Sequence, residues 1–167
     1  RDVDVDLGGG RRLTGTVTGL YDHRLVRVNY SRLKAKQRLE AWISLVALSA
    51  AHPGHWVARA IGRGEADAPA RATYAAVEEP MPILADLVAL HDLAMSRVLP
   101  LCPDTGRLYA QTAESTRPRW MVERDLKDQW RKESPAIDLV TAWGRRPSWE
   151  DLVAAPSTNG AEHLFGE

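Results

Sequence analysis

A chain of 167 residues, 44% hydrophobic and 26% charged, is long enough to build a globular core, and this composition excludes disorder of the whole chain. Lys and Arg number 22, as do Asp and Glu, so the zero net charge gives no overall sign of a nucleic-acid binder. The single cysteine, Cys102, excludes a disulfide within the chain and a cysteine-based zinc site. With no recognisable signal peptide or membrane-spanning run, we expect a cytoplasmic protein.

The chain opens with a strand pattern, because residues 2–7 place an apolar side chain at every second position. Gly8-Gly9-Gly10 allows a tight reversal, and residues 13–17 are typical of a returning strand. Residues 25–30 form the third predicted strand, so we expect an antiparallel meander. The first residue, Arg1, favours a fragment of a longer polypeptide.

A long helix is predicted over residues 32–51, with Ser31 as its N-cap and apolar side chains along one stripe. His52-Pro53-Gly54 breaks this pattern and ends the helix. Residues 56–61 then predict another strand, and residues 72–77 a further one.

The second half of the sequence is predicted to be mainly helical. Residues 65–71, which are small, charged and contain a proline, are expected to form a loop before it. Pro80 and Pro82 suit the first turn of a helix that runs to about Val98, and Pro100 and Pro103 are expected to end it. Further helices are expected at residues 108–113, 121–132 and 137–143 and from residue 148, before a tail at 156–167.

This order of elements predicts an α/β (α+β) fold with a small mixed central sheet flanked by helices and a helical C-terminal part. We expect a single domain over residues 1–167. Within it, residues 1–64 hold the meander, the long helix and a strand, and residues 65–155 hold a strand plus helices.

Charge is unevenly distributed along the sequence. Residues 1–64 hold 11 Lys/Arg against 5 Asp/Glu, a net charge of +6, and residues 65–167 hold 11 against 17, a net charge of −6. This asymmetry is compatible with a basic face for phosphate and an acidic face for another partner. A chance segregation of solvated charges would produce the same pattern.

Basic residues around the third strand and the start of the long helix give the most usable functional signal. Phosphate binding needs such a density of positive charge, and cations at a helix N-terminus oppose the helix dipole. A solvated helix face is the alternative interpretation. The candidate DNA-binding residues are Arg24, Arg27, Arg32, Lys34, Lys36 and Arg38.

Asp2, Asp4 and Asp6 share one face of the first strand and could in principle hold a divalent metal. We favour a face turned to water, as is normal for polar residues in antiparallel sheets. A metal-dependent nuclease usually adds an acid and a lysine two positions apart on the next strand. Asp125-Leu126-Lys127 has this spacing, but it lies in a predicted helix, where residues two apart do not face each other. We therefore predict no catalytic residue and no metal ligand.

Histidine, cysteine and tryptophan give weaker signals. None of the five histidines forms the helical pair of a zinc protease, and His91, on an apolar stripe, is expected to lie in the core. Cys102 is expected to be a buried structural thiol. Of the six tryptophans, Trp42 and Trp56 fit the core, and we favour core over interface for those of the helical part.

The stretch from Asp4 to Val46 resembles the opening of the C-terminal domain of RecC, the gamma chain of exodeoxyribonuclease V. It shares an alternating acidic strand, a glycine turn, a strand carrying Leu13-Thr14-Gly15, a basic strand, and a helix containing Trp42-Ile43. The later strand at Trp56 and the tryptophan-containing helical end are consistent with the same domain. The Ala- and Arg-rich composition suits a high-GC bacterium.

The resemblance implies a fold similar to the PD-(D/E)xK nucleases without their active site. It implies a place in a cytoplasmic helicase–nuclease that processes double-strand DNA ends for repair by homologous recombination. The implied partners are the beta (RecB) and delta (RecD) subunits and the DNA ends. No cofactor is expected in this chain, while the assembled enzyme would use ATP and Mg²⁺. Two alternatives stay open: an active nuclease that uses Asp2, Asp4 and Asp6, and a protein-interaction domain without DNA contact.

Overall fold

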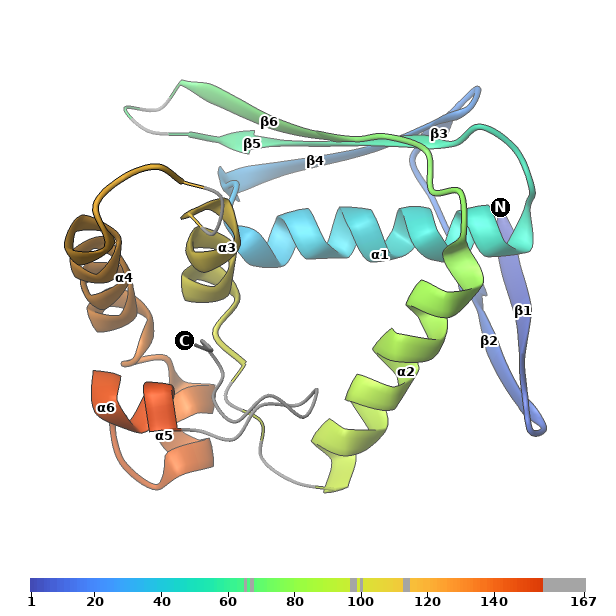
Figure 1. Ribbon diagram of the computed structural model, residues 1–167. Coiled ribbons are helices and arrows are strands. Elements are labelled where there is room, and N and C mark those ends of the chain that lie inside the picture. Colours follow the sequence, from blue (N-terminus) through green and yellow to red (C-terminus); the bar gives the residue numbers. More distant parts are fainter. Residues whose placement is uncertain (65, 67, 97–98, 100, 113–114, 155–167) are drawn as a thin grey trace. The chain divides into compact units, whose positions relative to one another are not determined.

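The computed structural model describes residues 1–64, 66, 68–96, 99, 101–112 and 115–154. The chain forms two compact units, Arg1–Ala89 and Leu90–Glu167 (Figure 1). Mixed α/β architecture with a small mixed sheet and a helical C-terminal part is confirmed. The single domain and the likeness to nucleases stay predictions. The predicted tail, His163 and Val98 fall outside the described residues.

The first two strands form a hairpin of their own, with β1 (Asp2–Gly8) antiparallel to β2 (Arg11–Thr16). Val3 and Val5 are buried and the alternating Asp2, Asp4 and Asp6 are exposed, which is the pattern that the sequence predicts. Gly8, Gly9 and Gly10 all have positive φ, a conformation that side chains with a Cβ rarely adopt. The predicted strands and glycine turn are therefore confirmed.

A separate four-stranded sheet has the order β3-β4-β5-β6 and contains β3 (Leu20–Tyr21), β4 (Arg24–Arg32), β5 (Val57–Arg63) and β6 (Pro69–Tyr74). β4 is antiparallel to β3 but parallel to β5, and β5 is antiparallel to β6. The predicted meander through the first three strands is therefore wrong. Gly19 explains the difference, because it has a positive φ and lies close to Val26. The chain therefore folds the short β3 onto β4, and β4 does not pair with β2.

Helix α1 (Ala35–Ala51) connects the parallel strands β4 and β5, and it begins later than predicted. Ser31 is not its N-cap, because β4 continues through Arg32 and the chain turns at Lys34. The backbone N–H of Lys34 donates to the side-chain oxygen of Gln37 at 3.1 Å. Gln37 thus supplies the return half of a capping box without a serine at the cap.

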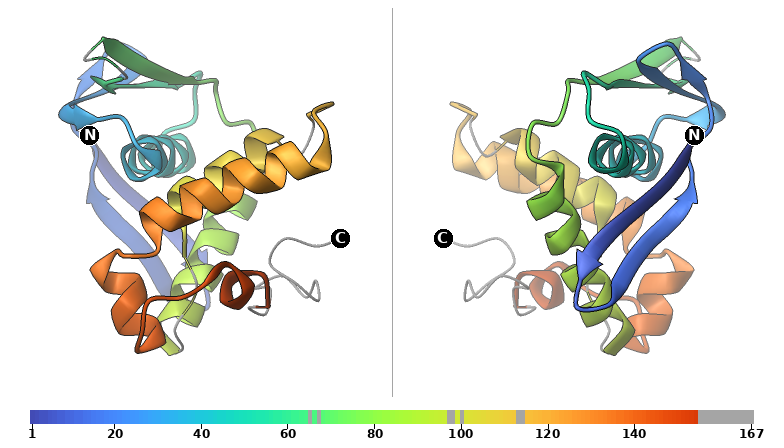
Figure 2. Two further views of the ribbon diagram at one scale, coloured as in Figure 1. Left: turned by 90° about the vertical axis from the view of Figure 1, so that its left-hand side faces the viewer. Right: turned by 90° about the vertical axis from the view of Figure 1, so that its right-hand side faces the viewer.

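Helix α1 packs on one face of the four-stranded sheet (Figure 2), and small residues line this contact. Ala41 of α1 is fully buried in a cluster with Ala60 of β5 and Ala72 of β6. A Cβ added to Gly62 would lie 3.0 Å from the carbonyl oxygen of Ser31. The backbone near Ser31 can approach β5 this closely only because the side chains on the inward face of the sheet are small.

A larger core lies at the other end of α1. Leu45, Leu48 and Trp56 are buried there, together with Val3 and Val5 of the hairpin. The Trp56 indole N–H donates to the carbonyl oxygen of His52, the residue that follows α1, at 2.7 Å. Trp56 is a core residue as predicted, and Trp42 packs half-buried against the same cluster.

The strand predicted at 72–77 begins and ends earlier, as β6. The loop predicted for 65–71 is therefore wrong for residues 69–71, while residues 65 and 67 lie outside the described part. Register explains the earlier start, because Pro69 and Ala70 pair with the last residues of β5. Helix α2 (Pro80–Ser96) begins at Pro80 as predicted, and its Leu84 is buried in the core of the first unit.

The second unit contains α3 (Pro103–Thr112), α4 (Arg119–Glu133), α5 (Ile137–Trp143) and α6 (Trp149–Ala154). The three last helices are confirmed. The prediction for α3 was too short, since Pro103 opens this helix and does not merely end the one before it. The core joins Cys102, Trp130, Leu139 and Leu152, so Trp130 is a core tryptophan as we expected.

Two other predictions about buried side chains are wrong. His91 was expected in the core, but its side chain is 69% exposed and its Nδ1 lies 3.6 Å from the Asp92 carboxylate. The apolar stripe of α2 is buried at Leu84 and exposed again at Met95, so the stripe did not locate a core there. Trp120 is 60% exposed, unlike the core tryptophans.

No helix among the described residues is long and apolar enough to cross a membrane.

Candidate functional site

The three aspartates of β1 lie on the exposed face of the hairpin, and each has its own partner. Two guanidinium nitrogens of Arg12 on β2 donate hydrogen bonds to the Asp4 carboxylate, at 2.6 and 3.0 Å. The Thr16 hydroxyl donates to Asp2 at 2.7 Å, and the backbone N–H of Gly8 donates to Asp6 at 2.9 Å. The hydrogen bonds from Arg12 hold the pKa of Asp4 below its ordinary value. At Asp4, a guanidinium thus occupies the position next to the carboxylate that a metal would need.

The acid–lysine spacing of Asp125-Leu126-Lys127 lies on α4, and its two charged groups have different partners. Asp125 accepts hydrogen bonds from Arg117 at 2.7 Å and from Arg124 at 3.2 Å, and these bonds lower its pKa. Lys127 pairs with Glu123 one turn earlier, at 2.7 Å. The geometry is that of solvated helix ion pairs. Among the described residues, no group of three or more His, Cys, Asp or Glu could hold a metal ion.

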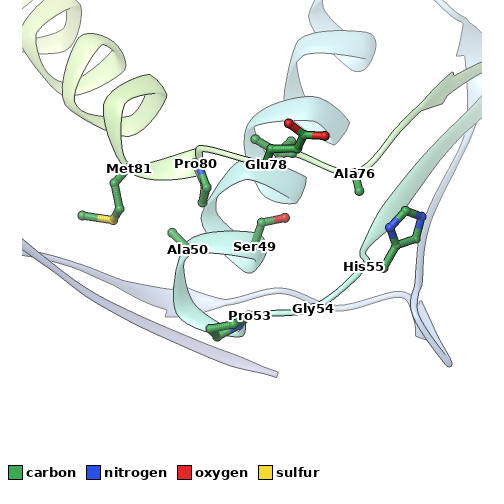
Figure 3. A pocket seen from close by; sticks show the side chains of 10 residues that line it. Ser49, Ala50, Pro53, Gly54, His55, Ala76, Glu78, Pro80 and Met81 are labelled. Carbon is green, nitrogen blue, oxygen red and sulfur yellow. The ribbon is translucent and has the colours of Figure 1, made fainter.

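A cavity of about 500 Å³ lies between the end of α1 and the segment before α2 (Figure 3). Ser49 is buried at its wall, and its hydroxyl has no hydrogen-bond partner. His55 and Glu78 also line it, which are residue types found in nucleophilic sites. No hydrogen bond joins these three side chains in the described structure, so no nucleophile–base relay is assembled there.

The cysteine lies in the second unit and is chemically quiet. Cys102 is buried, as predicted, and burial followed by the nearby Glu133 raises its pKa to about 12. A thiol with such a pKa carries almost no thiolate near neutral pH. Glu133 is engaged elsewhere, because its carboxylate accepts hydrogen bonds from the Thr105 backbone and hydroxyl at 2.7 and 2.6 Å.

The six basic candidates do not form one patch. Arg27 points to the α1 side of the sheet, where its guanidinium lies 3.5 Å from the Ser44 hydroxyl. Lys34 and Lys36 are exposed around the first turn of α1, and Arg38 is half-buried there. Arg24 and Arg32 are exposed on the opposite side of the sheet. The structure therefore divides the predicted DNA-binding residues among three places.

Three arginines that the sequence analysis did not single out lie beside Arg24 and Arg32. The face of the four-stranded sheet turned away from α1 is called the open face, since no described element of the first unit covers it (Figures 1 and 2). Register places on it the side chains of Tyr21, Arg24, Val26, Val28, Arg32, Val57, Arg59, Ile61, Arg63, Pro69, Arg71 and Thr73. The missed signal is the alternation of β5, which places Arg59 and Arg63 on the same face, opposite the small residues at positions 58, 60 and 62.

Comparison with known proteins supports the family resemblance that the sequence suggested. Residues 1–114 match the family model described as the RecC C-terminal domain. The chain is 38% identical over 172 aligned residues to the RecBCD enzyme subunit RecC of Mycobacterium tuberculosis (strain H37Rv), covering 99% of this chain and 15% of the relative. It is 47% identical over 117 residues to that of Mycolicibacterium smegmatis, covering 66% of this chain and 10% of the relative. The matched part of the chain thus spans only about 10–15% of the length of these curated relatives.

Proposed function

We propose that this chain, which belongs to the RecC C-terminal domain family, is a non-catalytic, nuclease-like domain of the gamma subunit of the RecBCD enzyme, exodeoxyribonuclease V. In this proposal the domain works in the bacterial cytoplasm, in double-strand break repair by homologous recombination. It holds the subunits together and guides DNA, while hydrolysis takes place elsewhere in the enzyme.

The pair of hydrogen bonds from Arg12 to the Asp4 carboxylate is the main observation that supports a non-catalytic role. A metal-dependent nuclease needs carboxylates that are available to a divalent cation and a lysine close to the reacting phosphate. Here a cross-strand guanidinium at 2.6 Å neutralises the middle carboxylate of the series. The described lysines lie at the start of α1 and on α4, on other elements than the hairpin. The arrangement favours a structural hairpin over a metal centre.

The proposed partners follow from the relatives, which carry the name of a subunit of the RecBCD enzyme. We therefore assign the beta (RecB) and delta (RecD) subunits and double-strand DNA ends as partners of the whole protein. The assembled enzyme would use ATP and Mg²⁺, and the chain itself would bind neither. Guidance of DNA is supported by exposed cations, among them Arg24, Arg32, Lys34 and Lys36.

The test compares DNA degradation by the assembled enzyme before and after removal of the three carboxylates. The full-length protein carrying Asp2→Ala, Asp4→Ala and Asp6→Ala is assembled with the beta and delta subunits and given linear duplex, ATP and Mg²⁺. We expect the rate of degradation to stay within about twofold of wild type, because no step uses these groups. Sedimentation of the same sample controls for assembly. Loss of most of the activity in an intact complex would refute the proposal and favour an active nuclease.

A further inference from the structure

The residues that register places on the open face carry positive charge and no negative charge. Five of the twelve residues that register places on it are arginines and none is an aspartate or glutamate; the arginines are Arg24, Arg32, Arg59, Arg63 and Arg71. Among the described residues, no ion pair forms to Arg24, Arg32, Arg59 or Arg71. Arg24, Arg32, Arg59 and Arg71 have no acid among the residues that register places beside them, so they repel one another, and a surface that keeps them is complementary to a polyanion.

Aromatic and aliphatic side chains lie among these cations. Tyr21 is 67% exposed and Val28 is 69% exposed on this face. Tyr30, which is 98% exposed, has no strand partner and lies next in sequence to the open-face residues, in the irregular part of β4 between Val28 and Arg32. Such an apolar surface gains nothing from facing water and is typical of a binding site. On neighbouring strands Val26 pairs with Arg59, and Ile61 pairs with Arg71. Cations and apolar side chains therefore lie side by side on this face.

We propose that the open face binds single-stranded DNA. Unpaired bases present faces that stack on exposed aromatic rings, and arginines follow the phosphates of the same strand. A duplex hides its base faces and would leave Tyr21 and Tyr30 without a role, and a broad sheet face does not enter the major groove. An acidic protein surface would match the arginines but not the exposed rings as well. This inference rests on the proposed role in guiding DNA, and it names the form of DNA and the surface.

Photochemical cross-linking tests the proposal in the full-length protein. A single strand of thymidines containing 5-bromodeoxyuridine is bound, irradiated and digested with trypsin. Tyr30 then lies in the tryptic peptide 28–32 and Tyr21 in the peptide 13–24. Trp120, an exposed aromatic residue of α4, lies in the peptide 120–124 and is the matched control. We expect adducts in 28–32 and 13–24 at least about fivefold stronger than in 120–124, because bases stack on the open face.

Charge reversal gives a second, site-specific measurement. The strand concentration that half-saturates the adduct in peptide 28–32 reports affinity at this face. We expect Arg59→Glu with Arg71→Glu to raise it about tenfold or more, since two phosphate contacts are lost. Arg119→Glu with Lys132→Glu changes net charge equally on α4, away from every residue assigned to DNA, and we expect less than about threefold there. Circular dichroism of both variants shows whether each remains folded.

The outcomes separate this inference from the proposed function. Adducts confined to other peptides of residues 1–167, or an equal affinity of the open face for duplex, would overturn the single-strand platform and leave DNA guidance standing. No adduct anywhere in residues 1–167 would overturn both. Equal weakening by the two charge reversals would assign the effect to bulk charge and overturn the role of the open face.

Discussion

At the scale of single residues, the Asp4–Arg12 ion pair is the contact of the hairpin that bears most directly on metal binding. Asp4 is exposed, so the pair contributes little to stability, but it sets the charge state of the carboxylate. The lowered pKa of Asp4 means that the folded state binds its proton less readily than the unfolded chain. The small contribution of the pair is therefore present above the ordinary pKa of 3.8 and is lost as the pH falls through the lowered value.

The corresponding prediction concerns the titration of Asp4. Arg12→Ala should raise the pKa of Asp4 to near 3.8, because the hydrogen bonds that lower it come from this guanidinium. Carboxyl carbon shifts followed by nuclear magnetic resonance against pH measure this value directly. Arg11→Ala on the same strand is the control, and it should leave the midpoint of Asp4 in place. An unchanged midpoint in Arg12→Ala would mean that the pair does not form in solution.

A second residue-scale prediction concerns the start of α6. The Ser148 hydroxyl accepts a hydrogen bond from the Asp151 N–H at 3.1 Å, and the Asp151 carboxylate accepts one from the Ser148 N–H at 2.7 Å. This reciprocal pair is a capping box. Ser148→Ala should lower the free energy of unfolding by about 1 kcal/mol, as measured by urea denaturation. Ser148→Asp, which can still cap, should recover most of that loss, and a loss equal to that of Ser148→Ala would contradict capping.

At the scale of elements, the close approach of β5 to the end of β4 and the residue that follows it depends on a glycine. A Cβ at position 62 would lie 3.1 Å from the Leu33 Cβ and closer still to backbone. Gly62→Ala should therefore lower the free energy of unfolding by about 1–3 kcal/mol, because the crowded atoms have to move. Gly15, also within a strand, has nothing within 4 Å of such a Cβ. Gly15→Ala is the matched control and should change stability by less than about 0.5 kcal/mol.

The helices of the second unit are joined by a side-chain cap that no local pattern announces. Glu133, the last residue of α4, accepts hydrogen bonds from the first turn of α3 at Asp104 and Thr105. Glu133→Ala should lower the free energy of unfolding by about 2 kcal/mol, since several donors lose their partner together. Glu133→Gln keeps an acceptor and should lose less. Equal losses in thermal or urea unfolding would show that charge, and not the hydrogen bonds, stabilises this contact.

At the scale of the whole molecule, short-range patterns were enough for most of the elements. The alternation at Val3 and Val5 and the proline at position 80 predicted β1 and α2, because both signals act within a few residues. Pairing could not be predicted in the same way. The parallel partnership of Val26 with Arg59 joins residues 33 positions apart, and it depends on how α1 folds back over the sheet.

The candidate site shows the same division between local and long-range information. The sequence placed Arg24 and Arg27 together because they are neighbours along one strand, but they point to opposite faces of the sheet. Conversely, Arg24 and Arg59 share a face although they are far apart in the sequence. The open face therefore appeared only once the register of all four strands was known.

The central claim is that this domain joins the subunits of its enzyme without catalysing hydrolysis, and its placement at a subunit interface is the most direct test. The full-length protein is assembled with the beta and delta subunits and treated with a lysine-specific cross-linker, and linked peptides are identified by mass spectrometry. The four lysines of this chain are Lys34, Lys36, Lys127 and Lys132. We predict links from at least one of them to the beta or delta subunit. A co-sedimenting complex in which all their links stay within the gamma subunit would contradict the claim.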